Sequence, residues 1–569
     1  MTKPIPWVDG ITIGQMLRKT AEVYPGQEAL VFPEAAYRLN YRQFDDEVDR
    51  VARGLIALGI ARGEHVAIWG TNWPEWALLQ FATARIGAVM VTINPAYRTS
   101  ELSYVLKQSD AVALFLIDKF RKSNYLDMIT ECVPALSSPM GENVSVIPRI
   151  PAGLQSAEYP RLRHVVVMKG KPLAGMIGWR DFLDWGLATS AEQLAEREAA
   201  CKPSDPINIQ YTSGTTGFPK GAMLTHRNLL LNAYWIADCQ KLTTADRMCV
   251  PVPFYHCFGC VLGVLCAAIS GATLMIPAEY FDAEATLRCI SVERATVIYG
   301  VPTMFIAMLN HPSFAGSNMT SLRTGIMAGS PCPIEIMKRV VEEMGAREIT
   351  IAYGLTEASP VITQTRTDDP IELRVTTVGR PLPDLLVKLV DPATGEILGD
   401  NQQGELCTFG HGVMVGYYNM PEATALAIDA DGWLHSGDLA LRLPNGYYKI
   451  TGRIKDMICR GGENVYPREI EEFLLGHPAI QDVAIVGVPD HKYVEEIAGW
   501  IKLKAEMSLT DEELREYCRG KLAHYKIPRY LRFVDSFPQT VTGKIQKYKI
   551  RETMIEELGL GDVAQTKMA

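Results

Sequence analysis

One short run in the chain concentrates residues that could bind phosphate. It reads Gln210-Tyr211-Thr212-Ser213-Gly214-Thr215-Thr216-Gly217-Phe218-Pro219-Lys220-Gly221. Glycine allows backbone N–H groups to approach an anion closely, and the hydroxyl side chains and the lysine add further donors and a positive charge. Pro219 stands where a Walker A loop has its second glycine, so the run predicts a different kind of phosphate-binding loop. The alternative is a mobile polar surface loop.

The segments around this run predict the elements that hold it. A short strand is expected at 206–211 and an amphipathic helix at 224–239. Upstream, helical patterns alternate with short apolar strands, and this alternation predicts βαβ units with parallel sheets. Helices are expected at 11–24 and 73–87, with another that follows 40–44 and ends near 59, and strands are expected at 29–32, 66–70 and 89–93.

The C-terminal part predicts a separate, compact α+β unit. A helix, a strand, a turn and a second strand are expected across 467–499, followed by a helix at 509–522 and a strand at 530–533. At 569 residues the chain is too long for one ordinary core, and its length suggests about two to four domains.

Composition and charge exclude several classes of protein. Hydrophobic residues make up 47% of the chain and charged residues 21%, which is typical of a soluble globular protein. The net charge of −9 argues against a general nucleic-acid binder. The 12 cysteines are scattered, and the close pair Cys257 and Cys260 lies in an apolar run, so we expect buried structural thiols in a reducing, cytoplasmic protein.

No segment predicts secretion or an integral membrane span. Residues 1–10 lack a basic region followed by an apolar core, so no signal peptide is expected. The apolar stretch 258–276 approaches the length of a bilayer span, but glycines interrupt it. We interpret it as a buried helix, a turn at Ser270 and Gly271, and a strand at 272–277.

One further motif precedes the phosphate run and the others follow it in a fixed order, and together they identify a family resemblance. The chain resembles the adenylate-forming superfamily of acyl-CoA synthetases, luciferases and peptide-synthetase adenylation domains over nearly its whole length. The motifs are 94–98, 211–221, 328–333, 352–357, 404–406, 410–418, 432–439, 448–456, 461–467 and 537–545. The glycine-rich motif 410–418 is assigned a structural role in β-turns.

The resemblance implies an α/β fold in two parts. A large N-terminal domain, 1–453, is expected to bind AMP and the acyl group and to contain parallel or mixed βαβ sheets with a small β-barrel-like subdomain. A small, mobile α+β C-terminal domain is expected at 454–569.

The resemblance also assigns residues to ATP and Mg²⁺. Mg²⁺ is expected on Glu357 with Thr212, because this ion prefers oxygen ligands and bridges phosphates. Asp438 is expected to accept the ribose hydroxyls. Taken alone, Glu357 would be a solvated surface charge and Asp438 would cap its own turn. The expected nucleotide-binding residues are Thr212, Ser213, Gly214, Thr215, Thr216, Gly217, Lys220, Gly329, Ser330, Pro331, Ala352, Tyr353, Gly354, Thr356, Asp438 and Arg453.

Three C-terminal residues carry the remaining implied roles. Lys455 occupies the hinge position, where aspartate is common in the family and lysine also occurs. Gly462 would let the pantetheine arm of CoA pass close to the backbone. Lys544 would bridge the acyl carboxylate and the α-phosphate, and it would withdraw before CoA attacks. The expected catalytic residues are Lys544, Thr356, Glu357 and Lys220.

The acyl group is expected to contact an apolar wall. The implied residues are His256, Tyr299, Met304, Gly329 and Gly354. His256 would border the acyl pocket as a gate, although a lone histidine among aromatic residues is commonly part of a core. The chain contains 22 methionines, whose flexible side chains suit an alkyl chain; ordinary core packing is the alternative for most of them.

These assignments predict an AMP-forming acid–thiol ligase that activates a fatty acid, with medium- or long-chain acids favoured. ATP, Mg²⁺ and CoA are the expected cofactors and co-substrates. An adenylation enzyme that loads a separate acyl carrier protein and a ligase for aryl or branched acids remain alternatives. A nucleotide-hydrolysing regulator would need Lys544 or Glu357 to be missing, and both are present. A homodimer and a peripheral membrane contact are left open.

Overall fold

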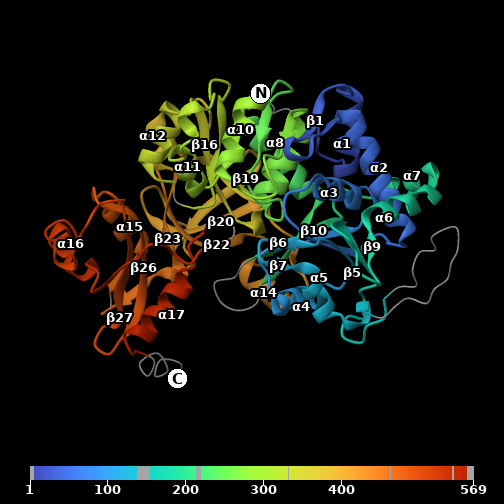
Figure 1. Ribbon diagram of the computed structural model, residues 1–569. Coiled ribbons are helices and arrows are strands. Elements are labelled where there is room, and N and C mark those ends of the chain that lie inside the picture. Colours follow the sequence, from blue (N-terminus) through green and yellow to red (C-terminus); the bar gives the residue numbers. More distant parts are fainter. Residues whose placement is uncertain are drawn as a thin grey trace. The chain divides into compact units, whose positions relative to one another are not determined.

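The computed structural model describes residues 6–137, 154–212, 219–330, 332–461, 463–540 and 544–560 (Figure 1). The chain forms two compact units. The first contains Met1–Leu386 and Thr408–Leu434, and the second contains Val387–Cys407 and His435–Ala569. The predicted domain boundary between 453 and 454 stays a prediction.

The first unit contains an eight-stranded sheet that ends in the phosphate-loop hairpin. Its order is β21-β11-β10-β4-β3-β5-β8-β9. The strands from β10 to β9 run parallel, whereas β11 is antiparallel to β10 and β21 is antiparallel to β11. The bounds are β21 Gly416–Tyr417, β11 Lys220–Thr225, β10 Pro206–Thr212, β4 Val89–Ile93, β3 His65–Trp69, β5 Ala111–Ile117, β8 His164–Lys169 and β9 Ile177–Gly178.

The central strands of this sheet are apolar because helices cover them. Every residue of β4 and β5 is buried, as expected for parallel strands covered on both faces. The helix α3 is buried on almost its whole circumference and contacts α1, α2 and α7. The helices near this sheet in sequence are α1 Ile13–Val23, α2 Tyr41–Ala57, α3 Pro74–Ile86, α4 Thr99–Gln108, α5 Tyr125–Cys132, α6 Trp179–Trp185, α7 Ala191–Ala199 and α8 His226–Cys239.

Local sequence signals set where several of these helices begin. Thr12 caps α1 and Asn40 caps α2, each in a reciprocal capping box with the third helical residue. Thr225 caps α8 in the same way. The helix predicted from residue 224 therefore begins at His226, and the residues before its cap form β11 instead.

A nine-stranded sheet forms the other half of the first unit. Its order is β18-β17-β16-β15-β14-β12-β13-β1-β2. The strands from β16 to β1 are parallel, and β17, β18 and β2 are antiparallel additions at the edges. The bounds are β1 Glu28–Phe32, β2 Tyr37–Asn40, β12 Arg247–Cys249, β13 Thr273–Met275, β14 Val297–Gly300, β15 Thr324–Ala328, β16 Glu348–Gly354, β17 Val361–Gln364 and β18 Arg380–Pro381.

Three helices cover one side of this sheet with a methionine-rich core. The helices α10 (Ala283–Glu293), α11 (Pro302–Leu309) and α12 (Ile334–Glu342) group near β16 in Figure 1. Their buried side chains join those of β14, β15 and β16 in one cluster. The cluster contains Met275, Met308, Met319, Met327, Met337 and Met344, so core packing explains these methionines. The shorter helices α13 and α14 span Ile371–Thr376 and Pro421–Ala427.

The apolar stretch 258–276 folds as a helix, a turn and a strand, as predicted. A π-helix at Phe258–Leu265 continues into α9 at Cys266–Ser270. Gly271 has a φ of +65°, which ends the helix before β13 begins. Among the residues that the structure describes, no helix is both long and apolar enough to cross a membrane.

The second unit contains most of a four-stranded sheet and a C-terminal α+β layer. The four-stranded sheet has the order β19-β20-β22-β23, with bounds β19 Leu385–Val390, β20 Gln403–Gly410, β22 Leu434–Arg442 and β23 Tyr448–Arg453. In the C-terminal layer β27 pairs with β26, β24 and β28. Its elements are β24 Ile458–Arg460, β25 Glu463–Val465, α15 Pro467–Leu475, β26 Ile480–Asp490, β27 Val494–Leu503, α16 Asp511–Cys518, β28 Tyr530–Phe533 and α17 Lys547–Glu557.

Alternating residues of β26 bury both faces of this C-terminal sheet. Val483 and Ile485 pack in a core with α15 and α16, whereas Ala484 and Val486 pack in a second core with α17. Successive strand residues point to opposite faces, so a continuous apolar strand needs helices on both sides. The predicted order of helix, strand, turn and strand in this region is confirmed.

Candidate active site

The two ends of the predicted phosphate loop lie opposite each other across a hairpin. In the antiparallel pair β10–β11, Thr212 is the partner of Lys220. The Thr212 hydroxyl donates to the Lys220 carbonyl at 3.4 Å. The predicted phosphate ligands Ser213, Gly214, Thr215, Thr216 and Gly217 lie outside the described residues.

Tyr417 connects the loop lysine with the predicted magnesium ligand. The Tyr417 hydroxyl donates to Glu357 Oε1 at 2.7 Å, and the Lys220 ammonium lies 5.0 Å from the centre of the Tyr417 ring. Burial, followed by the negative charge of Glu357, raises the pKa of Tyr417 well above its ordinary value. Tyr417 therefore stays a neutral donor towards the carboxylate. Lys220 and Glu357 are far apart in the sequence but belong to one contact network.

The backbone on either side of Tyr417 fixes this arrangement. Tyr418 N–H donates to the Gly221 carbonyl at 2.8 Å, and Val415 N–H donates to the Met223 carbonyl at 2.9 Å. Met414 N–H donates to the Glu357 carbonyl at 2.9 Å. The segment 414–418 thus holds both the phosphate-loop strand and the residue expected to bind the metal.

Sequence reasoning missed Tyr417, because the motif 410–418 was assigned a structural role in turns. The signal that could have identified Tyr417 is the presence of a tyrosine in a glycine-containing motif of the family that the chain resembles. Nothing local in the sequence indicates that this short strand pairs with β11, since the two strands are far apart in the chain.

The predicted adenine-binding residues lie at the carboxyl ends of two neighbouring parallel strands. Ala328, the last residue of β15, is the partner of Ala352 in β16. Gly329 follows β15 with a φ of +90°, and Tyr353 and Gly354 end β16. In open α/β sheets ligands bind outside the carboxyl ends of the strands. Ser330 is the next residue after Gly329, and Pro331 lies outside the described residues.

Gly354 allows the backbone of Pro360, just beyond the acidic residue, to approach the end of β16 closely. A Cβ atom at Gly354 would lie 1.8 Å from the Pro360 carbonyl oxygen, so any side chain there would clash with the backbone. Thr356 and Glu357 follow in a short 3₁₀ helix, Thr356–Ala358. Because β15 and β16 are neighbours, the sheet brings together at the carboxyl ends of its strands the residues Gly329, Ala352, Tyr353, Gly354 and Thr356.

Two of the predicted acyl-pocket residues adjoin Phe258. Phe258 N–H donates to His256 Nδ1 at 3.1 Å, and the rings of Phe258 and Tyr299 lie 5.8 Å apart. The Tyr299 hydroxyl accepts a hydrogen bond from Gln240 at 2.9 Å in the core. This contact favours a packing role for Tyr299, whereas the half-buried His256 has a partly exposed face.

Two further predicted acyl-pocket residues, Gly329 and Met304, lie around the start of α11. A Cβ atom at Gly329 would lie 3.1 Å from a methyl group of Val301, so glycine leaves this space open. Met304 is buried in the first turn of α11. All 12 cysteines are thiols outside any disulfide, and Cys257 and Cys260 are buried, as the sequence predicts. Cys260 accepts a contact from Gln210 at 3.1 Å.

The remaining predicted residues belong to the second unit. Asp438 and Arg453 are partners across β22 and β23, and Arg453 Nε donates to Asp438 Oδ1 at 2.7 Å. Lys455 lies in the short 3₁₀ helix Ile454–Asp456. Lys544 is exposed; its carbonyl accepts from Thr540 N–H at 2.8 Å, and its N–H donates to the Thr540 hydroxyl at 3.1 Å. Gly462 lies outside the described residues.

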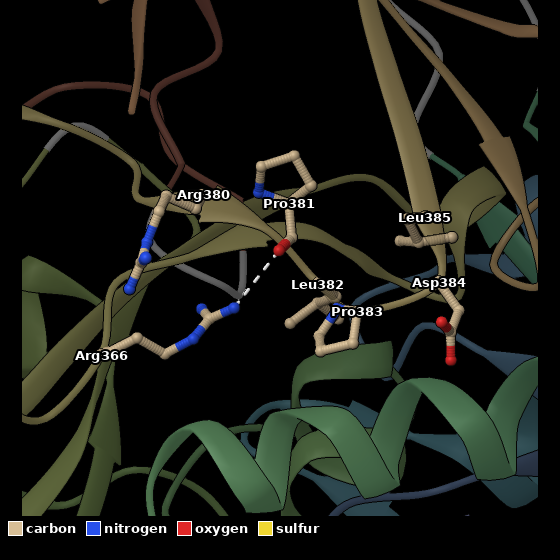
Figure 2. A pocket seen from close by; sticks show the side chains of 7 residues that line it. All are labelled: Arg366, Arg380, Pro381, Leu382, Pro383, Asp384 and Leu385. Atoms are coloured by element: carbon tan, nitrogen blue, oxygen red, sulfur yellow. Dashed lines mark hydrogen bonds between the residues drawn. The ribbon is translucent and has the colours of Figure 1, made fainter. Parts of the chain in front are cut away.

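A surface cavity of about 330 Å³ lies elsewhere in the first unit (Figure 2). Two arginines and a Pro-rich segment line it, and Arg366 donates to the Pro381 carbonyl at 3.2 Å. The lining residues are Arg366, Arg380, Pro381, Leu382, Pro383, Asp384 and Leu385. None of them is a predicted site residue.

The fold and this site together define an adenylate-forming enzyme. The AMP-binding enzyme model matches residues 17–418, and the AMP-binding enzyme C-terminal domain model matches residues 469–544. The chain therefore belongs to the AMP-binding enzyme family.

Individual relatives define the enzyme class more closely. YngI of Bacillus subtilis, named as an acyl-CoA synthetase, is 52% identical over 96% of this chain and 98% of its own. The mitochondrial medium-chain acyl-CoA ligase of Danio rerio is 42% identical over 96% of this chain and 89% of its own. The anthranilate CoA ligase AuaEII, solved with anthranoyl-AMP, superposes with a TM-score of 0.81 at 26% identity and covers 96% of this chain and 97% of its own.

These similarities confirm the predicted superfamily, fold class and enzyme class. The protein is an AMP-forming acid–CoA ligase with a nucleotide-binding site.

Proposed function

We propose that this enzyme converts medium- to long-chain fatty acids to their CoA thioesters, with medium-chain acids as the best substrates. The 42% identity to a medium-chain acyl-CoA ligase supports this substrate class. The carboxylate would attack the α-phosphorus of ATP, giving an acyl-adenylate and pyrophosphate. The CoA thiol would then attack the acyl carbon, release AMP and lose its proton to give the acyl-CoA.

The contact chain Lys220–Tyr417–Glu357 is the observation that carries the first step. ATP brings negative charge that must be neutralised and positioned during in-line displacement at phosphorus. Lys220 supplies a cation at the end of the phosphate-loop hairpin. Glu357 supplies a carboxylate that Tyr417 holds by a hydrogen bond of 2.7 Å. We assign Thr212, Lys220 and the loop residues between them to the β- and γ-phosphates.

Glu357 and Thr212 fit a magnesium ion by their chemistry. Both offer hard oxygen atoms, which are the ligands that Mg²⁺ prefers, and few protein ligands are needed where phosphates complete the coordination. When bound, the ion would neutralise charge on the transferring nucleotide. Thr356, next to Glu357, would donate its hydroxyl to a phosphate oxygen.

The nucleoside is assigned to the strand ends and to the second unit. Gly329, Ser330, Pro331, Ala352, Tyr353 and Gly354 would surround the adenine. Asp438 would accept the ribose hydroxyls, and Arg453, which donates to Asp438 at 2.7 Å, would keep that carboxylate oriented. Lys544 would contact the acyl carboxylate and the α-phosphate during adenylation only. Lys455 would act as the hinge for its withdrawal, and Gly462 would leave room for the pantetheine arm.

The acyl chain is assigned to the region bounded by His256, Met304, Gly329 and Gly354, with Tyr299 behind it. CoA is favoured over a separate carrier protein as acceptor, because the similar proteins are named as CoA ligases. Twelve cysteines without a disulfide support a reducing, cytoplasmic location. Sedimentation would decide between a monomer and a homodimer.

A panel of carboxylic acids tests the substrate class. CoA-dependent release of AMP should be measured with straight-chain acids from short to long and with aryl and branched acids of similar size. We expect kcat/KM to be highest for medium-chain acids. A maximum for an aryl or branched acid would overturn the assignment, and activity with a carrier protein but not with CoA would identify the acceptor as a carrier.

A further inference from the structure

We propose that Glu405, Cys407 and His435 form a binding site for a zinc-class transition-metal ion. The three residues belong to the second unit and lie outside the residues assigned to catalysis. Their donor atoms all lie within 4.8 Å of one another. The proposal does not depend on the identity of the acid or on the roles assigned to Lys544 and Glu357.

The sheet explains why these side chains meet. Glu405 and Cys407 are two residues apart on β20, and side chains at this spacing point to the same face of a strand. His435 lies near the start of β22, which neighbours β20 in the sheet. Two ligands from one strand and a third from its neighbour thus converge on one face.

The distances between the three donor atoms suit a shared metal ion if the Glu405 carboxylate moves slightly. His435 Nδ1 lies 3.4 Å from Cys407 Sγ and 2.8 Å from Glu405 Oε2. In a tetrahedral zinc site, ideal bond lengths place sulfur and nitrogen about 3.6 Å apart, and oxygen and nitrogen about 3.3 Å apart. The carboxylate would have to move by about half an ångström, and metal coordination would replace its hydrogen bond to the imidazole.

The geometry also argues against a catalytic triad in which His435 activates Cys407 as a nucleophile and Glu405 orients the histidine. In such a triad the nucleophile and the orienting carboxylate use opposite nitrogens of the imidazole. Here Cys407 and Glu405 both face Nδ1. Three donors that point at one place are typical of a metal site, and the combination of thiolate, imidazole and carboxylate favours Zn²⁺ over Mg²⁺ or Ca²⁺.

An ion can reach the cluster from the histidine side. Cys407 is fully buried, whereas the His435 side chain is 31% exposed and that of Glu405 is 12% exposed. The three protein ligands would leave a fourth position for water. Binding would release the Cys407 thiol proton to solvent, so affinity should rise with pH.

The cluster adjoins the residue assigned to the ribose. Gly437 N–H donates to Glu405 Oε1 at 2.9 Å, and Asp438 follows Gly437 directly. Movement of Glu405 towards a metal ion would disturb this contact. If Asp438 binds ribose as proposed above, Zn²⁺ should weaken AMP binding to the wild-type enzyme. This consequence rests on the proposed function, whereas metal binding itself does not.

Cobalt substitution tests the site directly. The full-length enzyme, freed of metal, should be titrated with Co²⁺ while its absorption spectrum is followed, and then with Zn²⁺ in competition. We expect one equivalent of Co²⁺ to give a thiolate-to-cobalt charge-transfer band in the near ultraviolet, and Zn²⁺ to displace it. Cys407→Ser should lose the band, and His435→Gln should weaken or lose it.

Cys459→Ser is the matched control, because Cys459 is a half-buried thiol of the same unit that does not belong to the cluster. It should keep the band at wild-type strength. Thermal unfolding would show whether each variant folds. If Cys407→Ser does not fold, the cobalt band of His435→Gln provides the test. Absence of the band in the wild-type enzyme, or its persistence in both folded cluster variants, would overturn the proposal.

Discussion

The Tyr417 hydroxyl donates a hydrogen bond of 2.7 Å to Glu357, while the ring of Tyr417 lies beside the Lys220 ammonium. One side chain therefore contacts both the cation at the phosphate loop and the carboxylate expected to hold the metal. The relationship depends on β21, because this short strand pairs with β11 and its flanking backbone bonds Glu357.

Tyr417→Phe tests this link. The variant keeps the ring that faces Lys220 but removes the donor to Glu357. Hydrogen bonds to charged groups contribute about 1.5–3 kcal/mol, so adenylation should slow by roughly tenfold or more. We also expect a higher Mg²⁺ concentration for half-maximal rate. The measurement is acid-dependent pyrophosphate exchange across a Mg²⁺ titration.

Tyr234→Phe provides the control, since Tyr234 lies on α8 with its ring against Trp235 and away from this network. It should behave as the wild type. A Tyr417→Phe enzyme with unchanged rate and unchanged Mg²⁺ dependence would show that the hydroxyl has no positioning role.

Glu357→Gln removes the charge but keeps an oxygen that can accept the Tyr417 hydrogen bond. Because a neutral amide is a poor ligand for Mg²⁺, the adenylation rate should fall by about 100-fold, a size typical of losing one strong electrostatic contact. Glu335→Gln, an exposed glutamate on α12, is the matched control. Near-normal rates for Glu357→Gln at ordinary Mg²⁺ concentration would refute the metal assignment.

Lys544→Ala should separate the two half-reactions. Formation of the acyl-adenylate should fall by about 100-fold, because the cation between carboxylate and α-phosphate is lost. Transfer from supplied acyl-AMP to CoA should stay near the wild-type rate. Lys549→Ala, on α17 nearby in sequence, should affect neither step. Equal losses in both half-reactions would contradict a role confined to adenylation.

Two buried histidines of the first unit should make it less stable in mild acid. Burial lowers the pKa of His226 and of His411 to about 4 each. Ile13 N–H donates to His226 Nδ1 at 3.2 Å, which requires a neutral imidazole. In the unfolded chain these rings gain protons near their ordinary pKa, so the folded state binds fewer protons and loses stability as pH falls from about 6.5 towards about 4.

His226→Asn tests this contribution, because asparagine can accept the same hydrogen bond without titrating. By linkage, His226 should account for about 2 kcal/mol of the stability lost between about pH 7 and about pH 5. Urea unfolding followed by tryptophan fluorescence at both pH values measures it, with His311→Asn as the comparison. If His226→Asn loses as much stability as the wild type over this interval, the histidine is not the titrating group.

Local patterns predicted most elements of the fold but not the contacts between distant ones. The apolar run 89–93 corresponds to β4 at Val89–Ile93, and the interrupted run 258–276 is helix, turn and strand, because burial and glycine act locally. The strand Lys220–Thr225 was missed, since its pattern merges with the start of α8 and its partners are β10 and the remote β21.

In the candidate site too, local motifs predicted individual residues but not the contacts between distant ones. Motif spacing identified Lys220 and Glu357, but the tyrosine between them became visible only when β21 was placed next to β11. Tyr299 stays a predicted acyl-pocket residue, and its hydroxyl accepts a hydrogen bond from Gln240 in the core, a contact set by packing that no local pattern encodes. The cluster of Glu405, Cys407 and His435 likewise depends on the pairing of β20 with β22.

The most direct test of the central claim is exchange of labelled pyrophosphate into ATP by the wild-type enzyme, with and without a medium-chain fatty acid and without CoA. The account predicts exchange only when the acid is present, and release of AMP and acyl-CoA in equal amounts once CoA is added. Exchange without acid, or production of ADP and phosphate in place of AMP, would contradict it.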